Sequence, residues 1–405
     1  MKKIIFSLVM LLFMAITAQS QSVTETPKTS AVSSKKWFET ISLRGYMQVR
    51  YNKLLETNSD LGCEQCDKSW GGNNSFFVRR GRLVFSGNVH DRVYIYIQPD
   101  FASSASTTSN NFLQIRDAYA DISLDAKKEF RFRIGQSKVP YGFENMQSSQ
   151  NRLTLDRNDA LNSAVANERD LGVMFYWAPK EKRELFSNLI RDGLKGSGDY
   201  GVVGLGIYNG QTANRVEANN NQHIVGRVSY PFEFKNGQVL EAGIQGYTGK
   251  YVVQSISTSK NVIVKPNGEY LDQRAAASFV LYPKPFGLQA EYNIGTGPEY
   301  NPANNTIEQK KLHGGYMQAF YNIKVDQQVV LPFVKYQMYR GGKKHELDAR
   351  SYSVNDLEIG LEWQPFKNLE IVADYTISSR RYEDAVKPIN VQQGNLLRLQ
   401  LQINF

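Results

Sequence analysis

The sequence predicts an all-β protein, a transmembrane antiparallel β-barrel of about 16 strands. Three observations lead to this fold class. Runs of about ten residues alternate between apolar and polar side chains, the connections between them are alternately short and long, and the last run ends on an aromatic residue. A mean hydropathy of −0.44 agrees with a protein that crosses a membrane as two-faced strands.

The chain begins with the pattern of a secretory signal peptide. Two lysines precede an apolar run at residues 4–16, and a small-residue triplet follows at 18–20. We expect 1–20 to be a signal peptide, 21–40 a flexible periplasmic leader rich in Ser and Thr, and 41–405 the barrel. No later apolar run approaches the ~20 residues that a spanning helix needs. An exported protein of this composition is therefore either soluble or crosses a membrane with strands.

The alternating runs give the candidate strands in order. They cover residues 42–51, 76–87, 92–101, 112–124, 129–138, 168–177, 200–208, 222–231, 239–250, 271–282, 286–294, 311–324, 329–340, 354–364, 368–378 and 396–405. One blemish is Pro332, which removes a ladder hydrogen bond and predicts a β-bulge.

The connections between these runs sort by length. Tight turns alternate with long stretches, which cover 52–75, 102–111, 139–167, 209–221, 251–270, 295–310, 341–353 and 379–395. Outer-membrane barrels have short periplasmic turns and long outer loops, so the pattern puts both termini on the periplasmic side. A soluble β-sandwich gives no reason for this sorting. The exception is 178–199, a long stretch where a short turn is due, in which ELFSNLI predicts a small helix.

The last strand, LRLQLQINF at residues 397–405, alternates without a fault. Its leucines, Ile403 and Phe405 share one face, which we expect to contact lipid, while Arg398 and its polar neighbours face the lumen. The segment resembles the C-terminal strand of outer-membrane barrels. That resemblance implies an outer-membrane location and recognition of the strand ending at Phe405 by the barrel assembly machinery.

Three stretches resemble the phosphate-selective porin O and P family. They are FFVRRGRLVFSGNV (76–89), DAYADI (117–122) and the region 133–175, which contains the pattern G-Q-x-K-x-P-x-G-x-E. The resemblance implies a homotrimeric outer-membrane porin whose loop 139–167 folds inward as the constriction.

The length and charge of this loop favour the same assignment. At about 29 residues it is longer than a surface connection needs. Its charges suit either a selectivity ring or a solvated surface loop. The candidate constriction residues are Tyr141, Glu144, Arg152 and Arg157.

Strand parity also predicts which charges line the lumen. The candidate anion-binding residues are Arg44, Arg50, Arg80, Arg82, Arg131, Arg133 and Lys138, whereas Arg79 has lipid parity and should snorkel near a rim. The family's long run of arginines at every second position is absent. We therefore expect a diffusion channel for small hydrophilic solutes with a modest preference for anions, phosphate among them.

Two alternatives to the anion-binding role stay open. The later strands carry carboxylates on lumen parity, namely Glu241, Glu291, Glu358, Glu362, Glu370 and Asp374. Acidic later strands opposite basic early strands would give a general, non-selective porin with a transverse field. Alternatively, the arginines are structural partners of Asp117 and Asp121 on the neighbouring strand.

Other functional classes find little support. The four histidines are dispersed, and S-T-S-K at 257–260 lies in a polar loop, so neither an enzyme site nor a metal site or cofactor is indicated. The net charge of +9 is spread in mixed sign, which does not suggest nucleic-acid binding. A secreted carbohydrate-binding β-sandwich would bury the lumen-parity charges unpaired. Cys63 and Cys66 in the first long loop predict a disulfide.

Overall fold

The computed structural model describes residues 36–55, 70, 74–102, 112–387 and 390–405. The chain divides into two compact units, residues 1–39 and 40–405. The described residues of the first unit belong to a 3₁₀ turn, η1 (Trp37–Thr40), and to the residue before it. The predicted signal peptide, most of the predicted leader, and Cys63 and Cys66 lie outside the described residues.

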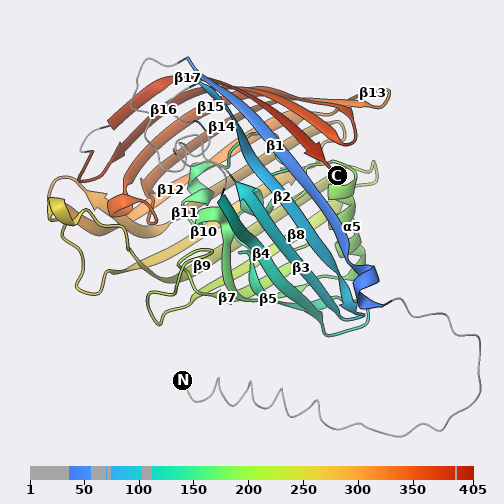
Figure 1. Ribbon diagram of the computed structural model, residues 1–405, viewed down its shortest axis with the longest axis horizontal. Helices are drawn as coiled ribbons and strands as arrows, with labels where there is room; N and C mark the ends of the chain where they lie inside the picture. The colour runs from blue at the N-terminus through green and yellow to red at the C-terminus, as the bar shows by residue number, and fades with distance from the viewer. Residues whose placement is uncertain (1–35, 56–69, 71–73, 103–111, 388–389) are drawn as a thin grey trace, which may run out of the picture. The chain divides into compact units, whose positions relative to one another are not determined.

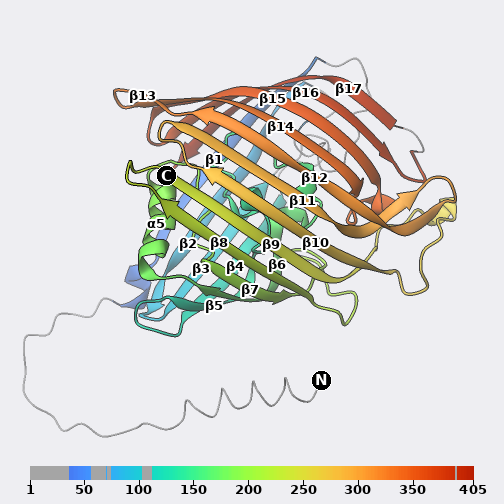
Figure 2. The ribbon, with the colours of Figure 1, turned by 180° about the vertical axis from the view of Figure 1, so that it is seen from behind.

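The second unit is a closed antiparallel β-barrel (Figures 1 and 2). Its strands are β1 (Ser42–Leu54), β2 (Ser75–His90), β3 (Val93–Ala102), β4 (Phe112–Ser123), β5 (Phe130–Lys138), β6 (Arg169–Trp177), β7 (Val203–Tyr208), β8 (His223–Glu233), β9 (Val239–Val252), β10 (Glu269–Leu281), β11 (Phe286–Asn301), β12 (Thr306–Tyr321), β13 (Ile323–Val325), β14 (Gln328–Gly342), β15 (Ser351–Phe366), β16 (Leu369–Glu383) and β17 (Asn390–Asn404). Because β12 and β13 both pair with β14, they occupy one position in the barrel wall. We call each such position a stave, and the described strands make sixteen staves. The predicted fold class is confirmed.

Pairing of the first and last strands closes the barrel. The register runs from Tyr46 opposite Asn404 to Leu54 opposite Leu396, so neither strand leaves an unpaired edge in the sheet. Near the end of this ladder, the N–H of Gly45 donates to the Phe405 carbonyl at 2.8 Å, and the N–H of Phe405 donates to the Gly45 carbonyl at 3.0 Å. A Cβ atom at position 45 would lie 2.6 Å from the Phe405 ring, so only glycine allows this approach.

The two faces of the wall differ as the alternation predicts. In β10, Phe279 is 41% exposed on the outside, whereas Arg274 is 4% exposed inside. Large apolar side chains are exposed on the outer face of most staves, and most charged strand residues are buried inside the barrel. This is the arrangement of a barrel whose outer face meets lipid and whose lumen is polar.

No helix among the described residues is both long and apolar enough to span a membrane.

The short and long connections alternate as predicted, but three long loops are shorter than expected. The predicted stretches 295–310, 341–353 and 379–395 reduce to 302–305, 343–350 and 384–389, because the flanking strands extend further. Polar and charged residues at these strand ends, such as Glu308 and Lys310, tolerate water on both faces, so the ladder continues beyond the apolar band. The predicted small helix is confirmed as α5 (Lys180–Arg191).

The predicted bulge at Pro332 is wrong. Phe320 pairs with Phe333 and Ile323 pairs with Val330, which is one continuous register. The proline instead interrupts the ladder, so β12 ends at Tyr321, and the N–H of Asn322 donates to the carbonyl of Pro285 at 2.8 Å.

A bulge does occur at Arg79. Gln48 pairs with Arg80, but the next residue, Val49, pairs with Val78, so Arg79 is the extra residue of β2. The bulge reverses the parity of the strand and turns Arg79 toward a cavity in the lumen. The prediction that Arg79 faces lipid near a rim is therefore wrong.

Candidate functional site: the lumen and its inward loop

The connection between β5 and β6 folds into the barrel. It contains α3 (Phe143–Met146), α4 (Asp159–Asn162) and the 3₁₀ turn η2 (Ala166–Glu168). The N–H groups of Phe143 and Glu144 donate to the carboxylate of Glu291 on β11 at 2.6 and 2.9 Å. The N–H of Asp159 donates to Gln337 on β14 at 2.9 Å. The loop therefore crosses the lumen to the far wall, as predicted for a constriction.

The G-Q-x-K-x-P-x-G-x-E pattern gives this loop its shape. The Gln136 amide donates to the carbonyls of Ile115 and Arg116, which holds the end of β5 against β4. The Lys138 ammonium donates to the carbonyls of Met146 and Gln147 at 2.7 and 2.9 Å, folding the loop back toward its own strand. Gly142 has a φ of 83°, which favours glycine, and it caps α3.

Glu144, the last residue of the pattern, pins the loop to the opposite wall. Its carboxylate accepts both the backbone and side-chain N–H of Asn158 at 2.7 Å and forms an ion pair with Lys335 on β14. Burial alone would raise the pKa of this carboxyl, but the charges of Lys335 and Arg152 hold it below its usual range. Glu144 is therefore ionised at neutral pH.

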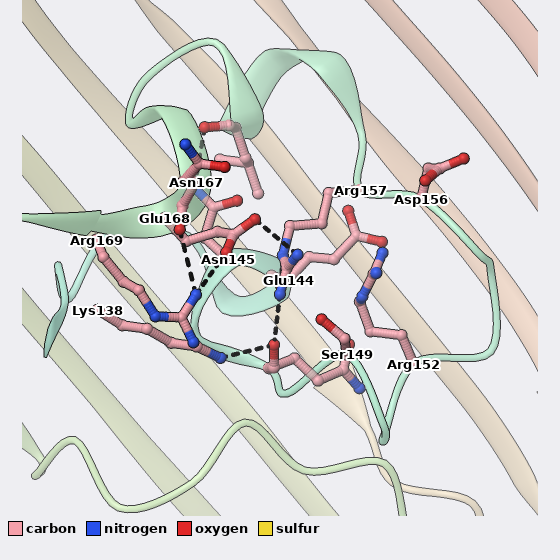
Figure 3. Close-up of polar contacts among 12 residues, drawn as sticks. Lys138, Glu144, Asn145, Ser149, Arg152, Asp156, Arg157, Asn167, Glu168 and Arg169 are labelled. Atoms are coloured by element: carbon pink, nitrogen blue, oxygen red, sulfur yellow. Dashed lines mark hydrogen bonds and ion pairs between the residues drawn. The ribbon is translucent and has the colours of Figure 1, made fainter. Parts of the chain in front are cut away.

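Glu168 organises the other end of the loop (Figure 3). Its carboxylate pairs with Arg157 at 2.7 Å, with Arg169 at 2.8 Å and with Arg116 at 3.3 Å. Burial opposes ionisation, but these three guanidinium groups hold the pKa of Glu168 well below its usual range. Burial in turn lowers the pKa of Arg157 to about 9. The network fixes the loop where it returns to β6.

Most of the predicted lumen cations are ion-paired. Arg82 pairs with Asp100 at 3.0 Å, and Arg133 contacts both carboxylate oxygens of Asp121 at 2.7 and 2.8 Å. Arg131 pairs with Asp199 at 2.8 Å, and Arg50 lies 3.7 Å from Asp156 while donating to Gln400. Arg44 is exposed, with its guanidinium 5.9 Å from the Tyr96 ring.

Of the two aspartates expected as structural partners of these arginines, one has the expected partner and the other does not. Asp121 is a partner of Arg133, in agreement with the structural alternative, but Asp117 pairs with Arg169 at 2.9 Å. Tyr141, the remaining candidate on the loop, donates its hydroxyl to Asn293 on β11. It packs against Tyr247 with ring centroids 4.9 Å apart.

Three further arginines differ from the paired ones above. Within the part of the chain that the structure describes, Arg79, Arg80 and Arg152 have no carboxylate as an ion-pair partner. Arg80 donates to the Gln48 amide at 2.8 Å, and Arg152 donates to the Leu155 carbonyl at 3.2 Å. The Nε atom of Arg79 and both Nε and Nη1 of Arg152 are buried without a hydrogen-bond acceptor from the described residues. Burial and the neighbouring charge of Arg80 lower the pKa of Arg152.

These three guanidinium groups line one cavity. It has a volume of about 490 Å³ and is also bordered by Trp70, Arg116 and His345. A second cavity of about 420 Å³ is lined by Arg44, Tyr96, Arg131, Arg133, Asp199 and Tyr200, and the two share no lining residue. Lys138 and the two loop residues whose carbonyls it binds line neither cavity. We call the first the outer cavity and the second the periplasmic cavity, following the long-loop and short-turn ends of the barrel.

The predicted lumen carboxylates are also engaged. Glu358 and Asp374 both pair with Arg398, at 3.0 and 3.1 Å, and Glu362 pairs with Lys195. Glu241 pairs with Arg227 at 2.8 Å. Local pairing therefore neutralises much of both sides of the transverse field that the sequence suggested.

Sequence reasoning placed Arg79 on the wrong face and missed the residues that hold the loop from the far wall, such as Lys335 and Gln337. The adjacent pair Arg79-Arg80 was a usable signal, because strict alternation would put one of two charges in lipid. No signal marked Lys335, since its partner is 191 residues away. Among the described residues, no group of three or more His, Cys, Asp or Glu side chains is placed to hold a metal ion.

A closed barrel with an apolar outer face, a charged lumen and a loop folded across it defines an outer-membrane porin, a water-filled diffusion channel. The profile of the phosphate-selective porin O and P family matches residues 56–405, so the chain belongs to that family, and the resemblance seen in the sequence is confirmed.

Solved structures share the fold. OmpF of Salmonella typhi is 12% identical, with 90% of this chain and 97% of that chain covered and a TM-score of 0.58. The outer-membrane channel DcaP of Acinetobacter baumannii is 14% identical over the same shares, with a TM-score of 0.54. An anion-selective porin from Comamonas acidovorans is 11% identical, covering 90% and 99%, with a TM-score of 0.51. No curated protein sequence matches the chain.

Proposed function

We propose that this porin has a modest preference for small anions, phosphate among them, and that the preference arises at Arg79, Arg80 and Arg152 in the outer cavity. The carrying observation is that these guanidinium groups gather without a carboxylate ion-pair partner in the described chain, whereas Arg82 and Arg133 are each paired with an aspartate. An oxyanion would accept the N–H groups that the protein leaves without an acceptor.

The surroundings increase the effect of each charge. The outer cavity is walled by the inward loop, so little water screens the guanidinium groups, and the effective dielectric is lower than in bulk solution. A focused positive potential raises the local concentration of anions at the narrow part of the path. The roles predicted for Arg44, Arg50, Arg82, Arg131, Arg133 and Lys138 in anion passage stay predictions.

The test is the reversal potential in a salt gradient across a planar bilayer. Replacing Arg79, Arg80 and Arg152 together with Gln should shift the reversal potential toward cation preference, because three positive charges are removed while the carboxylates of the cavity lining stay in place. The control is Arg133→Gln with Asp121→Asn, which removes a lumen ion pair without changing the net charge, and it should leave the reversal potential near the wild-type value. An unchanged potential in the triple variant would favour the general, non-selective porin instead.

The proposal extends to the assembly of the porin. The family resemblance supports a homotrimer in outer-membrane lipid, inserted by the barrel assembly machinery through the strand that ends at Phe405. We assign it no enzymatic activity. Chemical crosslinking in detergent should give a band at three times the mass of the chain, and crosslinking that yields monomer alone would contradict the trimer.

A further inference from the structure

The connection between β6 and β7 is unusually long for its end of the barrel. Described connections at the same end are short, such as 91–92, 234–238 and 367–368, but this one runs from 178 to 202. It contains α5, which lies at the end of the barrel where the C terminus is found (Figure 1). A turn that only joined two neighbouring strands would need far fewer residues.

From Leu194 to Ser197 the chain is buried rather than exposed to the periplasm. Leu194, Lys195 and Ser197 are 5%, 4% and 6% exposed. Leu194 packs in an apolar cluster with Phe143 of the inward loop. Lys195 has a φ of 63° and is flanked by glycines at 193 and 198 that also have positive φ, which gives the tight turn of the segment. We call residues 192–202 the periplasmic segment.

Lys195 reaches the opposite wall. Its ammonium forms an ion pair with Glu362 on β15, and both side chains are buried. In the order of the staves, β8, β9, β10, β11, β12 and β14 lie between β7 and β15 on one side, and seven staves lie between β6 and β15 on the other. The segment therefore begins on one wall and is fastened to a strand almost diametrically opposite, so it crosses the lumen.

The periplasmic segment also contacts the inward loop. The Lys195 carbonyl accepts the Gln147 side-chain amide at 2.7 Å and lies 3.5 Å from that of Gln289 on β11. Ser197 is one of the residues that line the periplasmic cavity, and no residue of the segment lines the outer cavity. The segment thus lies on the periplasmic side of the loop and borders the path that a solute takes after passing it.

We propose that the periplasmic segment is a second constriction in series with loop 139–168, and that Lys195 sets its width by holding the segment against Glu362. Breaking a buried ion pair leaves one charge without its partner, so the segment would be released when either residue is replaced. Lys195 is a positioning residue that limits the size of the solutes that pass. It adds a filter that is separate from the proposed anion preference.

The test compares Lys195→Met with Glu362→Gln by single-channel conductance. The first variant removes a positive charge and the second a negative charge, so a purely electrostatic effect on anions would change conductance in opposite directions. Release of the segment predicts that both raise conductance, by about a quarter, because the smaller of two series constrictions is widened. Exclusion of neutral polymers of graded size should move to larger polymers in both.

The charge-swapped variant, Lys195→Glu with Glu362→Lys, restores the pair and should return conductance toward the wild-type value. The matched control is Lys250→Met, which breaks a 3.4 Å ion pair with Glu269. This pair joins two neighbouring strands and does not cross the lumen, so conductance should not change. Opposite changes in the two single variants, or none in properly folded barrels, would overturn the proposal.

Heat-modifiable migration on gels establishes that each variant is a folded barrel. If the single variants do not fold, the conductance of Ser197→Tyr tests the proposal instead. Added bulk on a segment in the conducting path lowers conductance, and an unchanged conductance would place the segment outside that path and overturn the proposal. The reversal potential should stay near the wild-type value with Ser197→Tyr, which separates this filter from the anion site of the outer cavity.

Discussion

At the scale of single residues, the lumen uses charge mainly for fastening. Glu144, Glu168 and Asp121 each bind one or more cations from another segment of the chain, and these bonds hold the loop and the staves in register. A buried pair of this kind adds little net stability over an apolar pair, but the loss of one partner is costly. The arginines without a carboxylate are therefore the exception that needs a functional explanation.

Glu144 makes the fastening of the loop dependent on pH. Its pKa is lowered in the folded protein, so its contribution to stability is complete above the unfolded value of about 4.3 and is lost as pH falls through the lower folded value. The conductance difference between the wild type and Glu144→Gln should therefore stay constant from about pH 7 to pH 5 and shrink only in stronger acid, near pH 4 or below, as the Glu144 anchor is lost.

The matched variants test the same bond at neutral pH. Glu144→Gln should raise single-channel conductance and current noise at pH 7, because the ion pair to Lys335 is lost. Glu308→Gln makes the same change on an exposed hairpin and should leave conductance as it was. A conductance that is indifferent to Glu144→Gln would show that other bonds suffice to hold the loop.

At the scale of elements, the strands could be predicted because alternation is a local property of the sequence. The ends of the strands could not, since polar side chains at 295–310 suit a loop and a hairpin above the membrane equally well. The bulge at Arg79 could not be predicted either, because it depends on the register between β2 and β1. The alternation of one strand does not specify its register with a neighbour. The periplasmic segment left only an indirect trace, a glycine-rich stretch where a short turn was due.

At the scale of the whole molecule, two segments cross the lumen. Both start from neighbouring strands, and both are fastened to strands on the opposite side of the barrel. Loop 139–168 leaves β5 and is fastened to β11 and β14, and the periplasmic segment leaves β6 and is fastened to β15. The sequence predicted the first from its length and charge, together with the family resemblance. It could not predict their contact, which joins Gln147 to the Lys195 carbonyl between two different connections.

Two constrictions in series make a quantitative prediction for the combined variant. Series resistances add, so removing one leaves the other to limit the current, whereas removing both relieves the whole path. Deleting about ten residues from the tip of loop 139–167 should raise single-channel conductance several-fold. Combining that deletion with Lys195→Met should raise it by more than the sum of the two separate increases.

The measurement is single-channel conductance of the four proteins at one salt concentration, with heat-modifiable migration as the check of folding. The deletion is chosen so that it does not include Gln147. The hydrogen bond from Gln147 to the Lys195 carbonyl is then kept in all four proteins. A combined increase equal to the sum of two separate increases, each above zero, would mean that the two elements border parallel paths, and the lumen would then contain two routes instead of one. A combined increase equal to that of the deletion alone would mean that Lys195 lies away from the route of the ions.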